Sequence, residues 1–172
     1  MKKLFLGAFL ATSLIACTST EKKSTETADQ KSTAIEHIYK PIYTDNFKIG
    51  GEKNVLVAEQ FHKALFAKDY AQIETLLADT AVFEMEDGTT VKGKANLMDY
   101  VKKNFSVLTF NNFEIGAIIP VVGENGDQWV DIWDRADVTT PDGKTQKYLW
   151  QDAYKFQDGK IVQFLGFGKS PK

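Results

Sequence analysis

Cysteine and histidine are scarce in this 172-residue sequence, which contains one cysteine, Cys17, and two histidines, His37 and His62. A single cysteine cannot form a disulfide within one chain, so the fold must depend on its hydrophobic core. With two histidines and no cysteine after position 17, the folded part lacks the usual donors of a zinc site. We therefore expect no metal and no other cofactor, and Cys17 is no candidate for a catalytic thiol.

An excess of positive charge is also missing. The chain has 21 basic and 23 acidic residues, a net charge of -2, and no basic stripe. Proteins that bind nucleic acid concentrate Lys and Arg on one face, so we expect no nucleic-acid partner. Neither a glycine-rich phosphate loop nor a serine nucleophile elbow is present, and the acidic turns lack the spacing of a calcium loop.

The N-terminus combines a basic start with a short apolar run. Met1–Lys3 precede LFLGAFLATSLIA, which is too short to span a membrane comfortably and is typical of a secretory signal. The run ends in LIAC, residues 14–17, which resembles the bacterial lipobox. We expect residues 1–17 to be a lipoprotein signal peptide, with Cys17 carrying the lipid that anchors the protein. The alternative is an ordinary signal peptide whose cysteine is incidental.

This resemblance implies a bacterial cell-envelope location. In a bacterium with two membranes, Thr18 after the cysteine does not suggest retention at the inner one, so the outer membrane is expected. Residues 18–34 contain no large apolar side chain and cannot bury enough surface to offset the entropy lost on ordering. We interpret residues 18–46 as a flexible tether and residues 47–172 as one folded domain.

Helical periodicity and alternating strands divide the domain into two parts. Apolar residues at helical spacing predict helices over 54–70, 71–79 and 95–105, with Asp69 as a cap. Alternating segments separated by Asp-Gly or Asn-Gly turns predict hairpins at 81–94 and long strands after residue 107. The strands are expected at 107–123, 128–140, 145–157 and 161–168. Helices followed by a meander indicate an α+β fold with helices on one face of a curved antiparallel sheet.

Three segments in this order resemble the nuclear transport factor 2-like superfamily and its SnoaL-like group. They are AEQFHKALFAKDYAQIETLLADTAVFE, DGTTVKGKANLMDYV and DAYKFQDGKIVQF. The resemblance implies a cone in which a curved antiparallel or mixed sheet wraps three N-terminal helices and leaves a pocket at its open end. It also implies a homodimer, since sheet faces in this superfamily commonly form dimers. Members include ketosteroid isomerases, polyketide cyclases and proteins without known chemistry, so the fold does not decide the function.

Two strands combine tryptophans with carboxylates. Alternation places Trp129, Asp131, Trp133 and Arg135 on one face of the strand at 128–140. Because that face carries the larger aromatic side chains, we expect it to line the concave side of the sheet.

On the next strand, Trp150, Asp152 and Tyr154 share a face. We expect Asp152 to point toward Asp131, and His62 to border the same pocket from the first helix. The pKa values of two acids in an aromatic pocket would differ from each other, so one acid could serve as the general acid and the other as the general base. The same group could instead bind a ligand, or the acids could be structural ion pairs in a filled core.

The resemblance bears on catalysis as well. Aligned on the isomerases, Met85 occupies the position of the general base, and Glu84 and Glu86 lie on the opposite strand face, so the isomerase mechanism is not supported. Asp152 could match the late-strand acid of the polyketide cyclases.

Three functions stay open. The leading prediction is binding of a small, partly apolar ligand. The alternatives are a lyase, isomerase or cyclase-like enzyme that uses Asp152 with Asp131, and a protein-interaction module without a ligand.

Overall fold

The computed structural model describes residues 36–169. The expected signal peptide, Cys17 and most of the expected tether lie outside the described residues. Met1–Ile38 and Tyr39–Lys172 are separate units, and the fold below is that of the second. Among residues 36–169, no helix has both the length and the apolar character needed to cross a membrane.

The three predicted helices are present. They are α1 (Lys53–Ala67), α2 (Tyr70–Leu76) and α3 (Lys94–Phe105). The carboxylate of Asp69 accepts a hydrogen bond from the backbone N–H of Gln72 at 3.1 Å, which confirms the predicted cap of α2. Such a bond satisfies one of the N–H groups that a helix start leaves without a partner.

Seven strands form one open sheet. They are β1 (Phe47–Ile49), β2 (Leu77–Glu84), β3 (Thr90–Lys92), β4 (Thr109–Gly123), β5 (Gln128–Thr139), β6 (Thr145–Gln157) and β7 (Lys160–Lys169). Their order is β1-β4-β5-β6-β7-β2-β3, and every pair is antiparallel except β2 with β7. The sequence analysis did not predict β1, because the strand has three residues and depends on pairing with β4, far along the chain.

Glycines shape the long strands at their turns and at one irregular point. Gly126 and Gly143 have φ of 85° and 81°, in the left-handed region that glycine adopts without a steric cost, and they close the β4–β5 and β5–β6 hairpins. The β4–β5 pairing shifts register between Ile115 and Ala117, which places an irregularity of the strand at Gly116.

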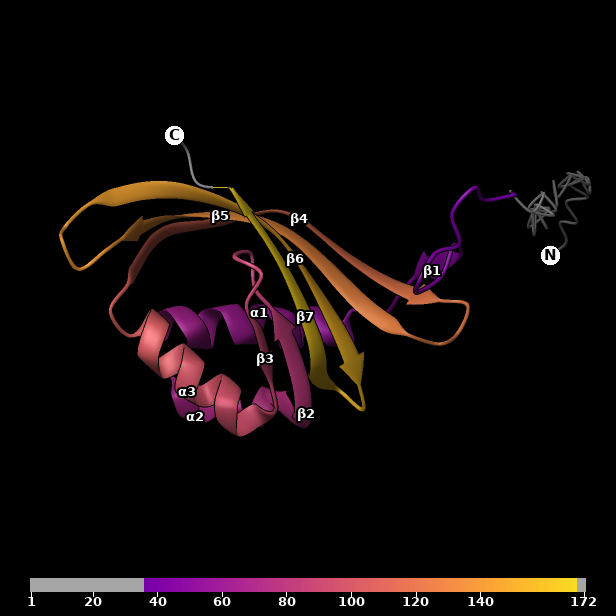
Figure 1. Cartoon of the computed structure of the whole chain (residues 1–172), viewed down its shortest axis with the longest axis horizontal. Helices are drawn as coiled ribbons and strands as arrows, with labels where there is room; N and C mark the ends of the chain where they lie inside the picture. The colour runs from indigo at the N-terminus through magenta and orange to yellow at the C-terminus, as the bar shows by residue number, and fades with distance from the viewer. Residues whose placement is uncertain (1–35, 170–172) are drawn as a thin grey trace, which may run out of the picture. The chain divides into compact units, whose positions relative to one another are not determined.

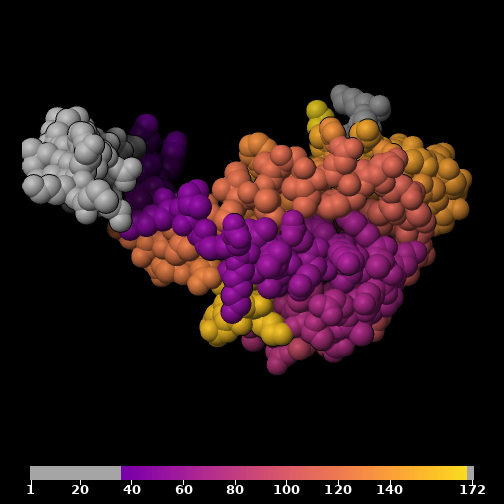
Figure 2. Space-filling view, turned by 180° about the vertical axis from the view of Figure 1, so that it is seen from behind, coloured from indigo at the N-terminus to yellow at the C-terminus, as the bar shows by residue number. Residues whose placement is uncertain are grey.

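The helices cover one face of the curved sheet. Figure 1 shows α1, α2 and α3 beneath the concave side of the long strands, and Figure 2 shows the helical surface, purple to magenta, below the orange strands. The largest fully buried side chains are Tyr154, Ile73, Leu97, Ile132, Ile161 and Val130. The core therefore lies between helices and sheet, as the α+β prediction requires.

The prediction of which face of β5 points inward is wrong. Val130, Ile132 and Ala136 are fully buried, whereas Trp133 is 51% exposed. The helices pack on the face of the smaller side chains, where Val130 and Ile132 belong to one core cluster with residues of α1. The tryptophan-bearing face of β5 is the outer face.

Candidate functional site

His62 projects from the inner face of α1 toward the sheet. Its side chain is buried, and its ring stacks on Phe113 with centroids 5.4 Å apart. The Nδ1 atom lies 3.2 Å from the carbonyl oxygen of Ala58, one helical turn earlier. If Nδ1 carries the proton donated to that carbonyl, Nε2 is directed at the sheet with its lone pair or a second proton.

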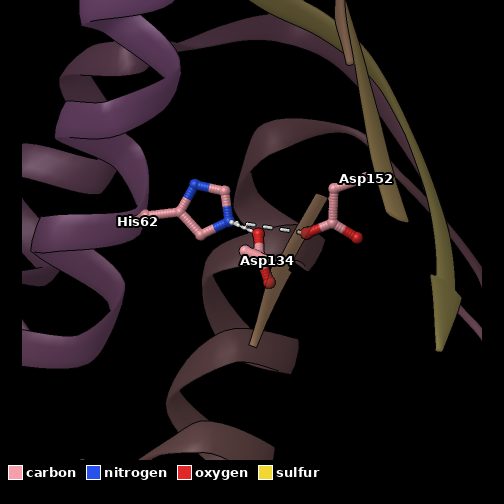
Figure 3. Close-up of side chains that lie close together, drawn as sticks. All are labelled: His62, Asp134 and Asp152. Atoms are coloured by element: carbon pink, nitrogen blue, oxygen red, sulfur yellow. Dashed lines mark ion pairs between the residues drawn. The ribbon is translucent and has the colours of Figure 1, made fainter. Parts of the chain in front are cut away.

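Two aspartates on neighbouring strands meet this ring nitrogen. Oδ2 of Asp134, from β5, lies 3.2 Å from Nε2 of His62, and Oδ2 of Asp152, from β6, lies 3.5 Å from it (Figure 3). Asp134 is 5% exposed and Asp152 7% exposed. We call these three side chains the His–Asp–Asp cluster.

Strand pairing explains why the two carboxylates converge. Ile132 lies opposite Asp152 in the β5–β6 ladder, and residues directly opposite share a face of a sheet. Asp134 is two residues beyond Ile132 and so is on that face as well. The cluster is therefore fixed by register, and a slip of one residue would separate the acids.

The hydroxyl group of Tyr154 lies against the His–Asp–Asp cluster, and together these groups form what we call the polar floor of the site. Its hydroxyl donates to Oδ2 of Asp152 at 3.4 Å and lies 3.3 Å from Nε2 of His62. Its ring packs against Phe61 and Phe164, with centroids 5.8 Å and 5.0 Å away, which holds the hydroxyl in place.

Burial and proximity shift the titration of these groups in predictable directions. Burial lowers the pKa of His62, but the hydrogen bonds and charges of Asp134 and Asp152 outweigh it and raise this pKa to about 9. Burial raises the pKa of Asp152, against the opposing effect of His62. Burial also raises the pKa of Tyr154, and the nearby carboxylates add to the effect, so its hydroxyl remains protonated.

A cavity of about 270 Å³ opens beside the cluster. Its walls are mainly aromatic and aliphatic and come from α1, α3, strands β4 to β7, and the end of β2 with the residues that follow it. Wall residues include Phe66, Tyr100, Phe105, Phe110, Tyr148 and Trp150. Apolar walls around a few buried polar groups are typical of small-molecule sites.

Several predicted site residues do line this cavity. His62, Trp150, Asp152 and Tyr154 all border it, as expected from the alternation on β6 and from the helix face of α1. The structure therefore brings four of the predicted residues together.

The other predicted residues do not reach the cavity. Asp131 lies opposite Ala153 in the β5–β6 ladder, on the face away from Asp152, so the expected Asp131–Asp152 pair is wrong. Burial raises the pKa of Asp131, which is half-buried on this outer face.

Trp129, Trp133 and Arg135 share the outer face with Asp131. Trp129 packs beneath Tyr43, with ring centroids 5.1 Å apart, and Arg135 Nε donates to Glu114 Oε2 at 2.7 Å. The prediction failed because side-chain size was taken as a sign of the inner face.

Asp134 is the residue that the sequence analysis missed. It is the lone acid in the buried stripe Val130, Ile132, Ala136 and Val138. A single carboxylate in an otherwise apolar strand face is costly to bury, and that interruption was the available signal.

Met85 also lines the cavity, directly after β2. A thioether cannot accept a proton at neutral pH, so the position aligned with the isomerase base holds no base in this chain. Glu86 and Asp87 also line the cavity, so the expectation that Glu86 faces away from the position of Met85 is wrong. The buried carboxylates and imidazole of the lining are those of the His–Asp–Asp cluster.

The chain has a curved sheet that covers three helices and a pocket between the sheet and the helices. This arrangement is that of the cone-shaped α+β folds. The family model described as a SnoaL-like domain matches residues 58–164, and the chain belongs to this family. A sequence search of curated proteins found no match.

Solved structures with the same fold have varied activities. The ketosteroid isomerase of Mycobacterium sp. is 20% identical, with 69% of this chain and 98% of that chain covered and a TM-score of 0.58. An LEH-like epoxide hydrolase of M. tuberculosis is 16% identical, with 68% and 79% covered and a TM-score of 0.57. A computationally designed 17-OHP binder is 16% identical, with 69% and 98% covered and a TM-score of 0.59. At these identities the likeness shows the fold alone.

Proposed function

We propose that the domain binds a small, partly apolar molecule in the cavity, with a hydroxyl or carbonyl group of that molecule against the His–Asp–Asp cluster. The observation that carries this proposal is the buried polar floor of an otherwise apolar pocket. Burying charged groups is costly, so their retention at a cavity favours a functional role.

The chemistry of the floor selects the polar group of the ligand. Asp152 and Asp134 can accept hydrogen bonds, while the Tyr154 hydroxyl can donate one. An alcohol, phenol or protonated amine would be held by the carboxylates, and a carbonyl by the hydroxyl. The aromatic walls suit a rigid ring system, and an isomerase of ketosteroids and a designed 17-OHP binder on the same fold support a search among steroid-like rings.

Tryptophan fluorescence provides a direct test, because one of the three tryptophans lines the cavity and two do not. A variant with Trp129→Phe and Trp133→Phe keeps Trp150 as the sole reporter. We expect steroid-like or aromatic polyketide-like ligands to change its emission in a saturable way. The matched variant with Trp129→Phe and Trp150→Phe keeps Trp133, on the outer face, and should not respond.

Asp152→Asn in the Trp150 reporter then tests the polar floor. Losing a hydrogen bond to a charged group should weaken binding by roughly 10-fold to 100-fold. Glu114→Gln, which changes an exposed carboxylate outside the cavity, should leave the affinity unchanged. A flat response of Trp150 across steroid, polyketide and glycan panels would contradict ligand binding and favour an interaction module.

A second candidate function is proton transfer to or from the bound molecule. The specific observation is that Asp152 and His62 both line the cavity and lie 3.5 Å apart, which places a possible acid and base within reach of one ligand. Any ligand found in the screen would be incubated with the protein and analysed by mass spectrometry and chiral chromatography. Turnover that Asp152→Asn abolishes while binding persists would support this function, and unchanged ligand would reject it.

We also propose that the domain is held at the cell envelope by lipid on Cys17. The support is the LIAC segment after a short apolar run. Radiolabelled palmitate should enter the wild-type protein and not the Cys17→Ser variant, and the variant should leave the membrane fraction. Equal labelling of both proteins would reject the anchor.

A further inference from the structure

We infer that the His–Asp–Asp cluster is a binding site for one divalent transition-metal ion of the zinc class, held by Nε2 of His62 and one oxygen each of Asp134 and Asp152. One donor atom from each of the three side chains lies within 4.8 Å of the other two. This site does not depend on the apolar ligand proposed above, because the metal alone can be measured.

The orientation of His62 leaves three electron-rich atoms facing one another. Nδ1 lies 3.2 Å from the carbonyl oxygen of Ala58, which can only accept, so the Nδ1 proton is directed there. In the neutral ring Nε2 then carries a lone pair, directed at two carboxylates. A second proton on Nε2 fills this place in the metal-free protein, and a metal ion that displaces this proton would be held by all three atoms. Donation from the second ring nitrogen to a backbone carbonyl is also the usual way in which a metal-binding histidine is oriented.

The spacing of the donors is also compatible with an ion between them. The Nε2–Oδ2 distances of 3.2 and 3.5 Å exceed the usual length of a charge-assisted hydrogen bond, about 2.7 to 2.9 Å. With metal–ligand bonds of about 2.0 to 2.2 Å, the edge of a coordination tetrahedron is about 3.3 to 3.6 Å. The two Nε2–Oδ2 distances, 3.2 and 3.5 Å, are close to the length of that edge.

Asp134 supplies an independent reason to expect a ligand. Its side chain is 1% exposed, and among the described residues its Oδ2 atom has no hydrogen-bond partner apart from the His62 ring, whose Nε2 lies 3.2 Å away. A buried carboxylate oxygen without a hydrogen bond loses its hydration without replacement, which is costly. Coordination of a cation at this oxygen would remove that cost.

The donor set and its charge select the class of ion. One imidazole nitrogen and two carboxylate oxygens suit zinc, manganese, iron or cobalt in the divalent state, whereas magnesium and calcium prefer oxygen alone. Two carboxylates with a neutral imidazole carry a charge of -2, which a divalent ion neutralises. All three donors border the cavity, so a further coordination position would be open to water or to a polar atom of a bound molecule.

The test uses the purified full chain carrying Cys17→Ser, which removes its one thiol as a competing ligand. The protein is treated with a chelator, dialysed, exposed to Zn²⁺ or Co²⁺, dialysed again and analysed for metal by mass spectrometry. We expect one ion per chain and a higher Tm with the ion bound. The intensity of the visible bands of Co²⁺ would report its coordination number.

Matched variants locate the ion. Asp134→Asn with Asp152→Asn should reduce metal uptake at least 10-fold, and Asp131→Asn, on the outer face of the same strand, should bind as the parent does. Should the double variant fold poorly, the parent protein still decides. Zn²⁺, which is diamagnetic, should shift the imidazole NMR signals of His62 and leave the Trp133 indole signal nearly in place. Failure to take up either ion, uptake that the double variant retains, or an unmoved His62 signal would overturn the inference.

Discussion

The face of β5 with the large aromatic side chains points outward, and the face with the smaller side chains points toward the helices. Composition alone suggested the reverse. The inner face carries Val130, Ile132 and Asp134, all buried, and the outer face carries Trp129, Asp131 and Trp133, with Trp133 51% exposed. Both faces combine apolar side chains with acids, Asp134 on the inner face and Asp131 and Asp137 on the outer face. Only the acid of the inner face meets His62 and the cavity, because the helices cover that face (Figure 1).

This comparison shows that the partner of a sheet face, and not the bulk of its side chains, decides where a site forms. A face packed closely on helices takes branched aliphatic residues, and an acid there is desolvated and must be paired. Asp131, on the outer face, is only half-buried and keeps part of its contact with water.

The largest expected difference between the faces is in packing. Ile132 is fully buried, so Ile132→Ala should lower the free energy of unfolding by about 3 to 4 kcal/mol, through lost transfer energy and a residual cavity. Trp133→Ala, one position away on the outer face, should lower it by less than about 1 kcal/mol at low protein concentration. Urea denaturation measures both, and equal losses would contradict the assignment of faces.

The pH dependence of stability should come from the inner face. The pKa of His62 is raised from 6.5 to about 9, because Asp134 and Asp152 outweigh its burial. A raised pKa in the folded state contributes stability that is full below pH 6.5 and is lost as the pH rises through 9. In the presence of a chelator, the unfolding free energy should fall by roughly 2 to 3 kcal/mol over this interval.

His62→Gln is the control for that pH dependence. Glutamine cannot titrate in this range, so the variant should show a flatter profile between pH 6.5 and 9 than the parent. A parent profile as flat as that of the variant would show that the carboxylates do not interact with the ring.

Asp134 and Asp131, on opposite faces of β5, should differ in a smaller but measurable way. Asp134→Ala removes one of the two carboxylates beside His62 and should cost about 2 kcal/mol in chelator, because the second carboxylate retains part of the interaction. Asp131→Ala should change the stability by no more than about 0.5 kcal/mol. A larger loss for Asp131 than for Asp134, measured by thermal denaturation at pH 7, would reverse the comparison.

The smallest effect on the fold is expected at the outer face, where we propose that two copies associate. Trp133 and Phe167 both lie opposite Gln151 and so share this face, and Phe167 is 62% exposed. Leu149, two residues before Gln151, is 49% exposed on the same face. An exposed group of this kind is typical of a protein interface.

Trp133→Glu should therefore convert a dimer into a monomer while changing the unfolding of the monomer little. Sedimentation at several concentrations measures the association, and Glu114→Gln is the matched change outside the group. A parent that sediments as a monomer at all concentrations would contradict the dimer.

Much of the fold could be predicted because local patterns were consistent with it. The periodicity of α1, the Asp69 cap and the Asp-Gly turns each depend on neighbouring residues, and these segments also carry the resemblance to the SnoaL-like family. The short strand β1 was missed, because its pairing with β4 depends on residues far along the chain.

The site was predicted in part. His62 and the residues of β6 were placed correctly, since one face of β6 is both aromatic and buried. Asp131 was predicted at the pocket, where the structure has Asp134. Alternation determines which residues share a face of the strand but not which face the helices cover. The expectation that no metal binds rested on counting histidine and cysteine, and two aspartates from neighbouring strands can supply the missing donors.

The central claim is that the inner face of the sheet brings two carboxylates onto the ring of His62, and NMR titration of that ring tests it most directly. The chain has two histidines, and His62→Gln assigns the signals. In metal-free protein the account predicts that the imidazole of His62 titrates with a pKa of about 9. Titration of His62 at or below its ordinary value of 6.5 would contradict the account, because the carboxylates of Asp134 and Asp152 would then not lie against it.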